Sequence, residues 1–115
     1  MTRLSQVKIE PTEGCIASAM GVLGHKWTAL ILRDLLSGPK RFCELERSIT
    51  KITPRILSQR LSDLETQGII EIVNGGPYRL TSKGQDLMPI IRQMAAWGSK
   101  YPTATDDLVP QSQAV

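Results

Sequence analysis

The chain has 115 residues, of which 41% are hydrophobic, and it carries a formal net charge of +3 at pH 7. This length suits one small domain with its own core, and the mild positive charge does not by itself identify a partner. No apolar run is long enough to span a bilayer and the N-terminal MTRLSQVKIE lacks a signal peptide's apolar stretch, so we expect a cytoplasmic protein without a membrane partner. A glycine-rich phosphate loop, paired carboxylates and a Ser/His/Asp arrangement are missing from the sequence, which argues against an enzyme and against a cofactor.

The first expected helix covers the apolar run from Ile16 to Leu23, after an N-terminal arm of residues 1–14. Cys15 stands at the start of this helix, where the helix dipole would stabilise a thiolate and make it more reactive. Two interpretations stay open for Cys15: a redox-sensing thiol, or a small buried hydrophobic side chain, since free cysteine is often buried. For Cys43, in the short helix beside Phe42, we expect a packing role. The two cysteines have no metal-ligand spacing, so we expect no metal.

The segments from Trp27 to Leu36 and from about Arg41 to Ser48 predict two further helices, separated by a turn at Ser37-Gly38-Pro39. The first of these is largely apolar and should be buried. Positive charge from Lys40 and Arg47 surrounds the ends of the second. Two such helices followed by a third have the spacing of a helix-turn-helix.

The sequence from Lys51 to Gln67 predicts that third helix, with two chemically different faces. Thr53 can act as its N-cap, and Pro54 suits the first helical position, where the N–H that proline lacks would have no intrahelical partner. At about 100° per residue, one face is an apolar stripe of leucines. This stripe consists of Leu57, Leu61 and Leu64. The opposite face carries almost no acid and consists of Arg55, Ser58, Gln59, Ser62 and Thr66.

That polar face predicts a DNA recognition helix, because arginine, glutamine and serine side chains can reach base edges or phosphates. The alternative is the solvated face of an ordinary amphipathic helix. Arg60 lies on the flank of the helix, where it could contact a phosphate or pair with Asp63 or Glu65.

A β-hairpin follows: residues 69–73 predict a half-buried strand, Asn74-Gly75-Gly76 a tight turn and Tyr78-Arg79-Leu80 the returning strand. The tip is short and holds no basic residue, which disfavours its contact with the minor groove and leaves Arg79 as the nearest candidate for a phosphate contact. Three helices followed by a hairpin predict an α+β, mostly α, winged helix-turn-helix.

The segment from about Lys83 to Tyr101 predicts a bent helix or two short ones, because Pro89 lies near its start and Gly98 near its end. It carries more apolar surface than a small winged domain can cover, so we expect it to contact a partner. The alternative is an ordinary helix of the domain's own core. Residues 102–115 are expected to form a weakly ordered tail.

Several motifs, in chain order, resemble those of the HxlR-type transcriptional regulators, bacterial winged-helix proteins related to the MarR group. They include Gly24-His25-Lys26-Trp27-Thr28, Gly38-Pro39-Lys40-Arg41-Phe42, Leu57-Ser58-Gln59-Arg60-Leu61 and Tyr78-Arg79-Leu80-Thr81-Ser82-Lys83-Gly84. The resemblance covers roughly residues 15–97 and implies a domain at residues 15–101 that binds DNA as a dimer. The short, uncharged wing departs from the longer, charged hairpin that is usual in the family.

The resemblance also implies that the C-terminal helix and the N-terminal segment pack across a two-fold axis, which would place two recognition helices about 34 Å apart. Cys15 matches a cysteine typical of the family, through which some members respond to electrophiles or oxidants. The residues expected at the dimer interface are Ile16, Leu87, Ile90, Ile91, Met94 and Trp97.

We therefore predict a sequence-specific transcriptional regulator that acts as a homodimer on a palindromic site in double-stranded DNA, with a protein-binding winged-helix module as the alternative. The polar face of the recognition helix favours DNA, because it lacks the aromatic and apolar anchors typical of protein interfaces. The operator, the regulated genes, the inducing signal or small-molecule effector and the choice between repression and activation do not follow from the sequence. The predicted DNA-binding residues are Lys40, Arg41, Thr53, Arg55, Ser58, Gln59, Arg60, Ser62 and Arg79.

Overall fold

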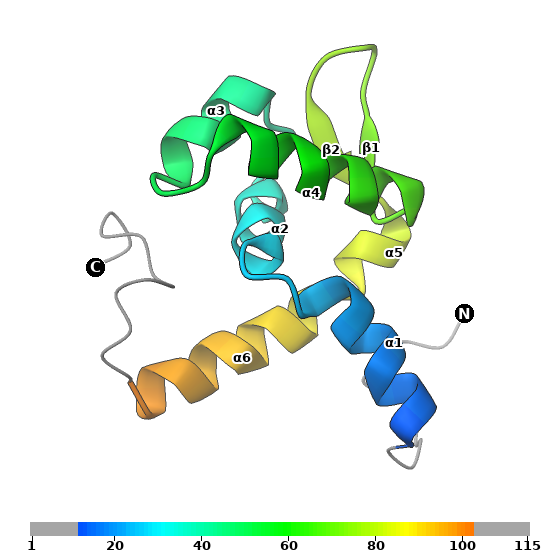
Figure 1. Ribbon diagram of the computed structural model, residues 1–115, viewed down its shortest axis with the longest axis vertical. Helices are drawn as coiled ribbons and strands as arrows, with labels where there is room; N and C mark the ends of the chain where they lie inside the picture. Colours follow the sequence, from blue (N-terminus) through cyan, green and yellow to red (C-terminus); the bar gives the residue numbers. More distant parts are fainter. Residues whose placement is uncertain (1–11, 103–115) are drawn as a thin grey trace.

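Helices dominate the computed structural model, which describes residues 12–102 (Figure 1). The order of elements confirms the predicted winged helix-turn-helix. The first helix begins two residues earlier than the predicted domain boundary at residue 15, whereas most of the predicted arm and tail, residues 1–11 and 103–115, lies outside the described part of the chain. The elements are α1 (Glu13–Leu23), α2 (Thr28–Leu36), α3 (Phe42–Ser48), α4 (Pro54–Thr66), β1 (Ile70–Ile72), β2 (Tyr78–Leu80), α5 (Ser82–Gln85) and α6 (Met88–Lys100).

The core lies where α2, α3 and α4 pack together with the hairpin, and it is mostly aliphatic, with Trp27 and Met88 also among its buried side chains. Ile31 and Leu32 of α2, Leu45 of α3, and Leu57 and Leu61 of α4 are all fully buried. Each such side chain contributes about 1.5–3 kcal/mol relative to leaving it in water. These contacts therefore fix which face of α4 is turned outward.

The predicted hairpin is confirmed, with β1 and β2 paired antiparallel so that Ile70 lies opposite Leu80. Its turn contains Asn74 and Gly75, whose φ angles of 51° and 68° are both in the left-handed region. Two consecutive residues of this kind are typical of the type I′ turn, whose twist matches that of a hairpin. The Asn-Gly pair therefore explains why the wing is short and regular.

A single residue before α3 pairs with the wing, a feature that the sequence did not reveal. The Lys40 N–H donates to the Tyr78 carbonyl at 2.9 Å, and the Tyr78 N–H donates to the Lys40 carbonyl at 2.7 Å. This bridge adds the segment that leads into α3 to the edge of the hairpin. The helix-turn-helix and the wing are thus joined by backbone hydrogen bonds as well as by side chains.

The backbone between α4 and β1 packs closely against α5. The Thr81 hydroxyl donates to the carbonyl of Gly68 and accepts the N–H of Gly84 at 3.2 Å, which caps α5. A Cβ atom on Gly84 would collide with the carbonyl of Ile69. Glycine is required at this position because only hydrogen leaves room for the neighbouring backbone.

The C-terminal region forms two helices, α5 and α6, which settles the choice left open by the sequence. Figure 1 shows α1 and α6 extending in different directions from the end of the molecule opposite α4. The radius of gyration of 14.6 Å exceeds the approximately 13 Å expected of a compact domain of this length, as projecting helices would cause. Within residues 12–102, no single helix is both long and apolar enough to cross a membrane. Taken together, α1 and α2 reach that length and apolar composition, but the two helices are bent by 74° relative to each other.

Replacing Gly84 by alanine should lower the free energy of unfolding by about 1–3 kcal/mol, because a methyl group there forces the Ile69 carbonyl away from α5. Gly14→Ala is the matched control, since a Cβ at Gly14 meets no atom within 4 Å. Urea denaturation of both variants tests this expectation. Equal stability of the two variants would contradict the close packing of α5.

Candidate nucleic-acid interface

The exposed face of α4 carries the polar side chains predicted for a recognition helix. Thr53 is the N-cap, its hydroxyl accepting the Ile56 N–H at 3.1 Å, and Pro54 occupies the first turn. The leucine stripe faces the core, which turns the opposite side of the helix to solvent. The exposed polar residues there are Arg55, Ser58, Gln59, Ser62 and Thr66, as predicted.

One acid, Asp63, lies beside this face, in line with the expectation that the face carries almost no acid. Asp63 accepts a hydrogen bond from Gln59 Nε2 at 3.1 Å and pairs with Arg60, its Oδ2 lying 3.0 Å from Arg60 Nη2. The Arg60 side chain is only 17% exposed. Of the two roles considered for Arg60, the structure therefore has it paired with Asp63, and its predicted phosphate contact would require that pair to open.

Arg41 lies between the start of α3 and the tip of the wing. Its backbone N–H donates to Glu44 Oε1 at 2.8 Å, an arrangement that caps α3. A Cβ atom on Gly76 would come within 3.0 Å of the Arg41 guanidinium, so this group lies directly against the turn of the hairpin. Lys40 is held nearby through its bridge to Tyr78. Both predicted phosphate contacts thus lie beside the wing.

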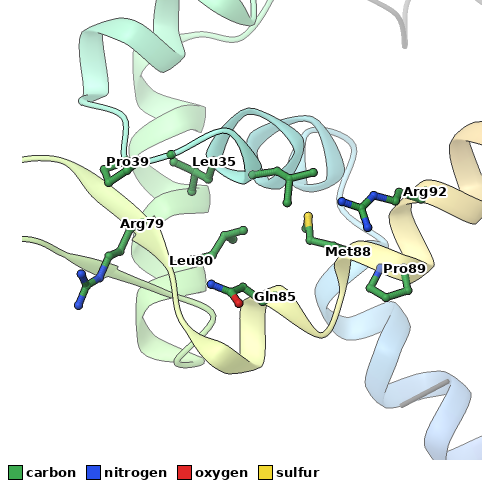
Figure 2. Close-up of a pocket in the computed structure, with 10 residues that line it drawn as sticks. Leu35, Pro39, Arg79, Leu80, Gln85, Met88, Pro89 and Arg92 are labelled. Atoms are coloured by element: carbon green, nitrogen blue, oxygen red, sulfur yellow. The ribbon is translucent and has the colours of Figure 1, made fainter. Parts of the chain in front are cut away.

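Arg79 is paired with an acid across the wing. Its Nε lies 2.7 Å from Glu71 Oε2, and both side chains are about half exposed. Figure 2 shows the Arg79 side chain pointing away from Leu80 and Met88, which face the interior near Leu35 of α2. An exposed pair of this kind contributes about 0–1 kcal/mol, so a phosphate could replace the carboxylate at little cost.

One apolar side chain on α4 lies outside the core, which corrects the expectation of a face without apolar groups. Ile56 is 39% exposed and lines a shallow groove with Trp27 and Arg55. Single exposed aliphatic residues are common on protein surfaces. Ile56 therefore does not amount to the buried aromatic anchors that a protein-binding face would be expected to carry.

The predicted dimer residues divide into two groups, with the half-buried Ile90 between them at the groove of α1 and α6. Leu87 and Ile91 pack against the core of their own chain, so part of α6 is an ordinary core helix. By contrast, Ile16, Met94 and Trp97 are 52%, 46% and 65% exposed. None of the residues of α1, all of which the structure describes, is buried.

A groove of about 420 Å³ separates α1 from the start of α6, and Cys15, Ile16, Met20, Ile90 and Met94 contribute to its lining. Exposed apolar side chains gathered in this way are typical of a surface that contacts a partner. The alternative interpretation, an internal helix, applies to Leu87 and Ile91 but not to the outer surface of α6.

Cys15 is exposed, so the interpretation of this residue as a buried hydrophobic side chain is wrong. It is the third residue of α1, and Thr12 is the N-cap. Its Sγ accepts hydrogen bonds from the Thr12 hydroxyl at 3.1 Å and from the Thr12 N–H at 3.2 Å. These bonds, the side-chain one foremost, lower the pKa of the Cys15 thiol.

Cys43 is also exposed, so its predicted packing role is wrong as well. The sequence missed both exposures because burial depends on how the helices pack. It did contain a signal for the Thr12 contact, since a threonine three residues before Cys15 has the spacing of a capping box. No group of three or more potential metal ligands occurs within residues 12–102.

Comparison with known proteins gives matches over most of the chain. Residues 22–106 match the family described as HxlR-like helix-turn-helix. The chain is 38% identical over 103 residues to the uncharacterized HTH-type transcriptional regulator YdeP of Bacillus subtilis, covering 84% of this chain and 80% of YdeP. The HTH-type transcriptional regulator YodB of the same organism is 37% identical over 90 residues, covering 73% of this chain and 80% of YodB.

Two solved structures are similar to this fold. Quinone-bound YodB superposes with a TM-score of 0.70 at 36% identity, covering 76% of this chain and 99% of that chain. The redox regulator HypR in its oxidized form has a TM-score of 0.71 at 33% identity, covering 77% of this chain and 98% of that chain. The role printed for YdeP and YodB, transcriptional regulation, is not enzymatic.

Replacing Thr12 by valine should raise the pKa of the Cys15 thiol toward its ordinary value, because the hydroxyl that stabilises the thiolate is removed. Thr12→Ser keeps the hydroxyl and should retain the lowered pKa. The measurement is the rate of iodoacetamide alkylation against pH, in a Cys43→Ser background with one reactive thiol. Identical midpoints for the valine and serine variants would show that the hydroxyl has no such effect.

Proposed function

Because the chain belongs to the HxlR-like helix-turn-helix family and is a transcriptional regulator of the helix-turn-helix type, we propose that it binds a palindromic double-stranded DNA site as a homodimer. The observation that carries this proposal is the exposed face of α4, with Arg55, Ser58 and Gln59 on a helix held rigidly by its leucines. In this proposal α4 enters the major groove with its N-terminal turns nearest the bases. Such a protein acts on the chromosome, so we place it in the cytoplasm.

Contacts to phosphates would come from the elements around α4. Lys40 and Arg41 lie between α3 and the wing, close to where a DNA backbone would pass if α4 lay in the groove. Arg79 would join them after exchanging Glu71 for a phosphate. Such contacts orient the protein on DNA, while α4 supplies the sequence preference.

The apolar surface of α1 and α6 supports the homodimer. It lies at the opposite end of the molecule from α4 (Figure 1), so a partner bound there would leave both recognition helices free. A two-fold axis through this surface would pair the same side chains from each copy, including Ile16, Met94 and Trp97. Two helices held about 34 Å apart would then reach successive turns of the major groove.

Cys15 is the residue through which we propose that oxidants or electrophiles change DNA affinity. Its thiol is exposed, has a lowered pKa and lines the groove between α1 and α6. Among similar proteins, YodB was solved with quinone bound and after diamide treatment, and HypR in reduced and oxidized forms. A group attached to Cys15 would alter how two copies pack, and thereby the spacing of the recognition helices.

Replacing Gln59 by alanine should cost about 1–3 kcal/mol on the preferred site and little on random DNA, because the amide would contact a base edge. Replacing Arg41 by alanine should instead weaken binding to every sequence. It should also reduce the slope of log affinity against log salt concentration by about one, because one phosphate contact and its released counterion are lost. Fluorescence anisotropy with specific and random duplexes at several salt concentrations separates the two effects. An equal loss for Gln59→Ala on both duplexes would remove its base-reading role.

Replacing Met94 by glutamate should produce monomers, because the two-fold axis would place two uncompensated charges in one apolar interface. Operator affinity should fall with the loss of the second half-site contact. Gln93→Glu, an exposed neighbour outside the α1/α6 groove, is the control with the same added charge. Ile91 is less suitable because it packs in its own chain. A dimer that persists in Met94→Glu during sedimentation would place the interface elsewhere.

Treatment with diamide or a quinone should change operator affinity in the wild type and in Cys43→Ser, but not in Cys15→Ser. Because Cys43 is also exposed, mass spectrometry must locate the adduct. Unchanged affinity of the wild type after complete modification of Cys15 would leave this thiol without a regulatory role, and the signal would then have to be a bound ligand.

A further inference from the structure

One carboxylate on α4 holds two of the predicted DNA-contacting side chains at the same time. Asp63 Oδ1 accepts from Gln59 Nε2 at 3.1 Å, and Asp63 Oδ2 lies 3.0 Å from Arg60 Nη2. Residues three and four positions apart lie on the same side of a helix, so the side chains of Gln59, Arg60 and Asp63 are neighbours on α4. The Arg60 guanidinium, on a mostly buried side chain, thus holds the Asp63 carboxylate, and the carboxylate holds the Gln59 amide.

The chemistry of Asp63 determines which way round the Gln59 amide lies. An ionised carboxylate can only accept hydrogen bonds, so it binds the amide through its nitrogen and not through its oxygen. The amide oxygen and the second N–H of Gln59 are left for a ligand. A glutamine without such a partner can turn its amide over and present either group in either place.

We propose that Asp63 is a positioning residue that orients the Gln59 amide to select adenine over guanine at one base pair of the operator. This inference rests on the proposed function, in which Gln59 faces the major groove. Adenine presents the N6 amino donor beside the N7 acceptor, which match the free oxygen and the free N–H of the oriented amide. Guanine presents two acceptors, N7 and O6. The Gln59 amide oxygen would then face the O6 acceptor and would lose the N–H donor that adenine offers there.

This arrangement also gives Arg60 a role other than its predicted phosphate contact. A lone carboxylate at the DNA surface would repel the phosphates, and the Arg60 guanidinium compensates that charge while fixing its position. Arg60 therefore acts through Asp63. The base preference of the helix depends on a side chain that need not touch DNA.

The test is a DNA-enrichment selection with the full chain, comparing the wild type with Asp63→Asn and Glu65→Gln. Asparagine is similar in size but can both accept and donate, so it no longer dictates the orientation of the Gln59 amide. At the base pair read by Gln59, the preference for adenine over guanine should fall about tenfold, while the rest of the site stays unchanged. Glu65→Gln removes the same charge from an exposed position of α4 and should keep the wild-type preference.

Two further variants make the outcome decisive. Gln59→Ala identifies the base pair concerned, and the double variant with Asp63→Asn should behave like Gln59→Ala alone, since Asp63 acts through Gln59. Asp63→Ala frees the Gln59 amide without adding a donor, and it should show the same loss of adenine preference. With two independent Asp63 variants, the test does not depend on the folding of one of them. Circular dichroism melting verifies that each variant is folded.

A wild-type adenine preference retained in both Asp63 variants would overturn the inference, and if Gln59→Ala still lost that preference, the proposed function would stand. No change of preference in Gln59→Ala would overturn the inference together with base reading by Gln59. Failure of the wild type to enrich any sequence would refute the proposed function itself.

Discussion

The packing of α4 on α2 and α3 is the constraint on which the other features of this molecule depend. Leu57 and Leu61 belong to the same buried cluster as Ile31, Leu32 and Leu45, and rotating α4 about its axis would expose them to water. Each exposed side chain would lower the free energy of unfolding by about 1.5–3 kcal/mol, so such a rotation would remove much of the stability of a small domain. The polar face of α4 is therefore presented at a fixed angle relative to α3 and the wing.

Polar and cationic side chains near this face are paired with acids within the protein. Arg60 and Gln59 share Asp63, and Arg79 pairs with Glu71 across the hairpin. Exposed ion pairs stabilise a fold little, but they limit the conformations of long side chains that would otherwise lose entropy on binding. The two ion pairs differ in exposure: both side chains of the Arg79–Glu71 pair are about half exposed, whereas in the Arg60–Asp63 pair the arginine side chain is only 17% exposed.

Features determined by neighbouring residues could be predicted from the sequence. Thr53 and Pro54 marked the start of α4, and Asn74-Gly75 marked the turn of the hairpin, because caps and tight turns depend on local backbone geometry. The bridge between Lys40 and Tyr78 could not be predicted, since a one-residue pairing between distant segments leaves no periodic pattern.

The candidate site was predicted less completely than the fold, since the partners of its side chains depend on tertiary structure. The exposed polar face of α4 followed from helical periodicity, but the hydrogen bonds of Asp63 depend on side-chain conformations. The exposure of Cys15 and Cys43 depends on helix packing, as does the division of α6 into Ile91, against its own core, and Trp97, in solvent. Hydrophobicity alone does not distinguish a surface that a chain buries by itself from one that it offers to another molecule.

The contact between Arg41 and Gly76 bears on how a hairpin tip without basic residues can present positive charge. Because Gly76 has no side chain, the guanidinium of Arg41 can rest on the turn and place its charge at the tip from a different element. A Cβ atom at position 76 would meet the guanidinium at 3.0 Å and force it to shift. The positive charge at the wing thus depends on two separated positions, Arg41, which supplies the cation, and Gly76, which leaves room for it. Neither residue alone indicates a charged wing tip.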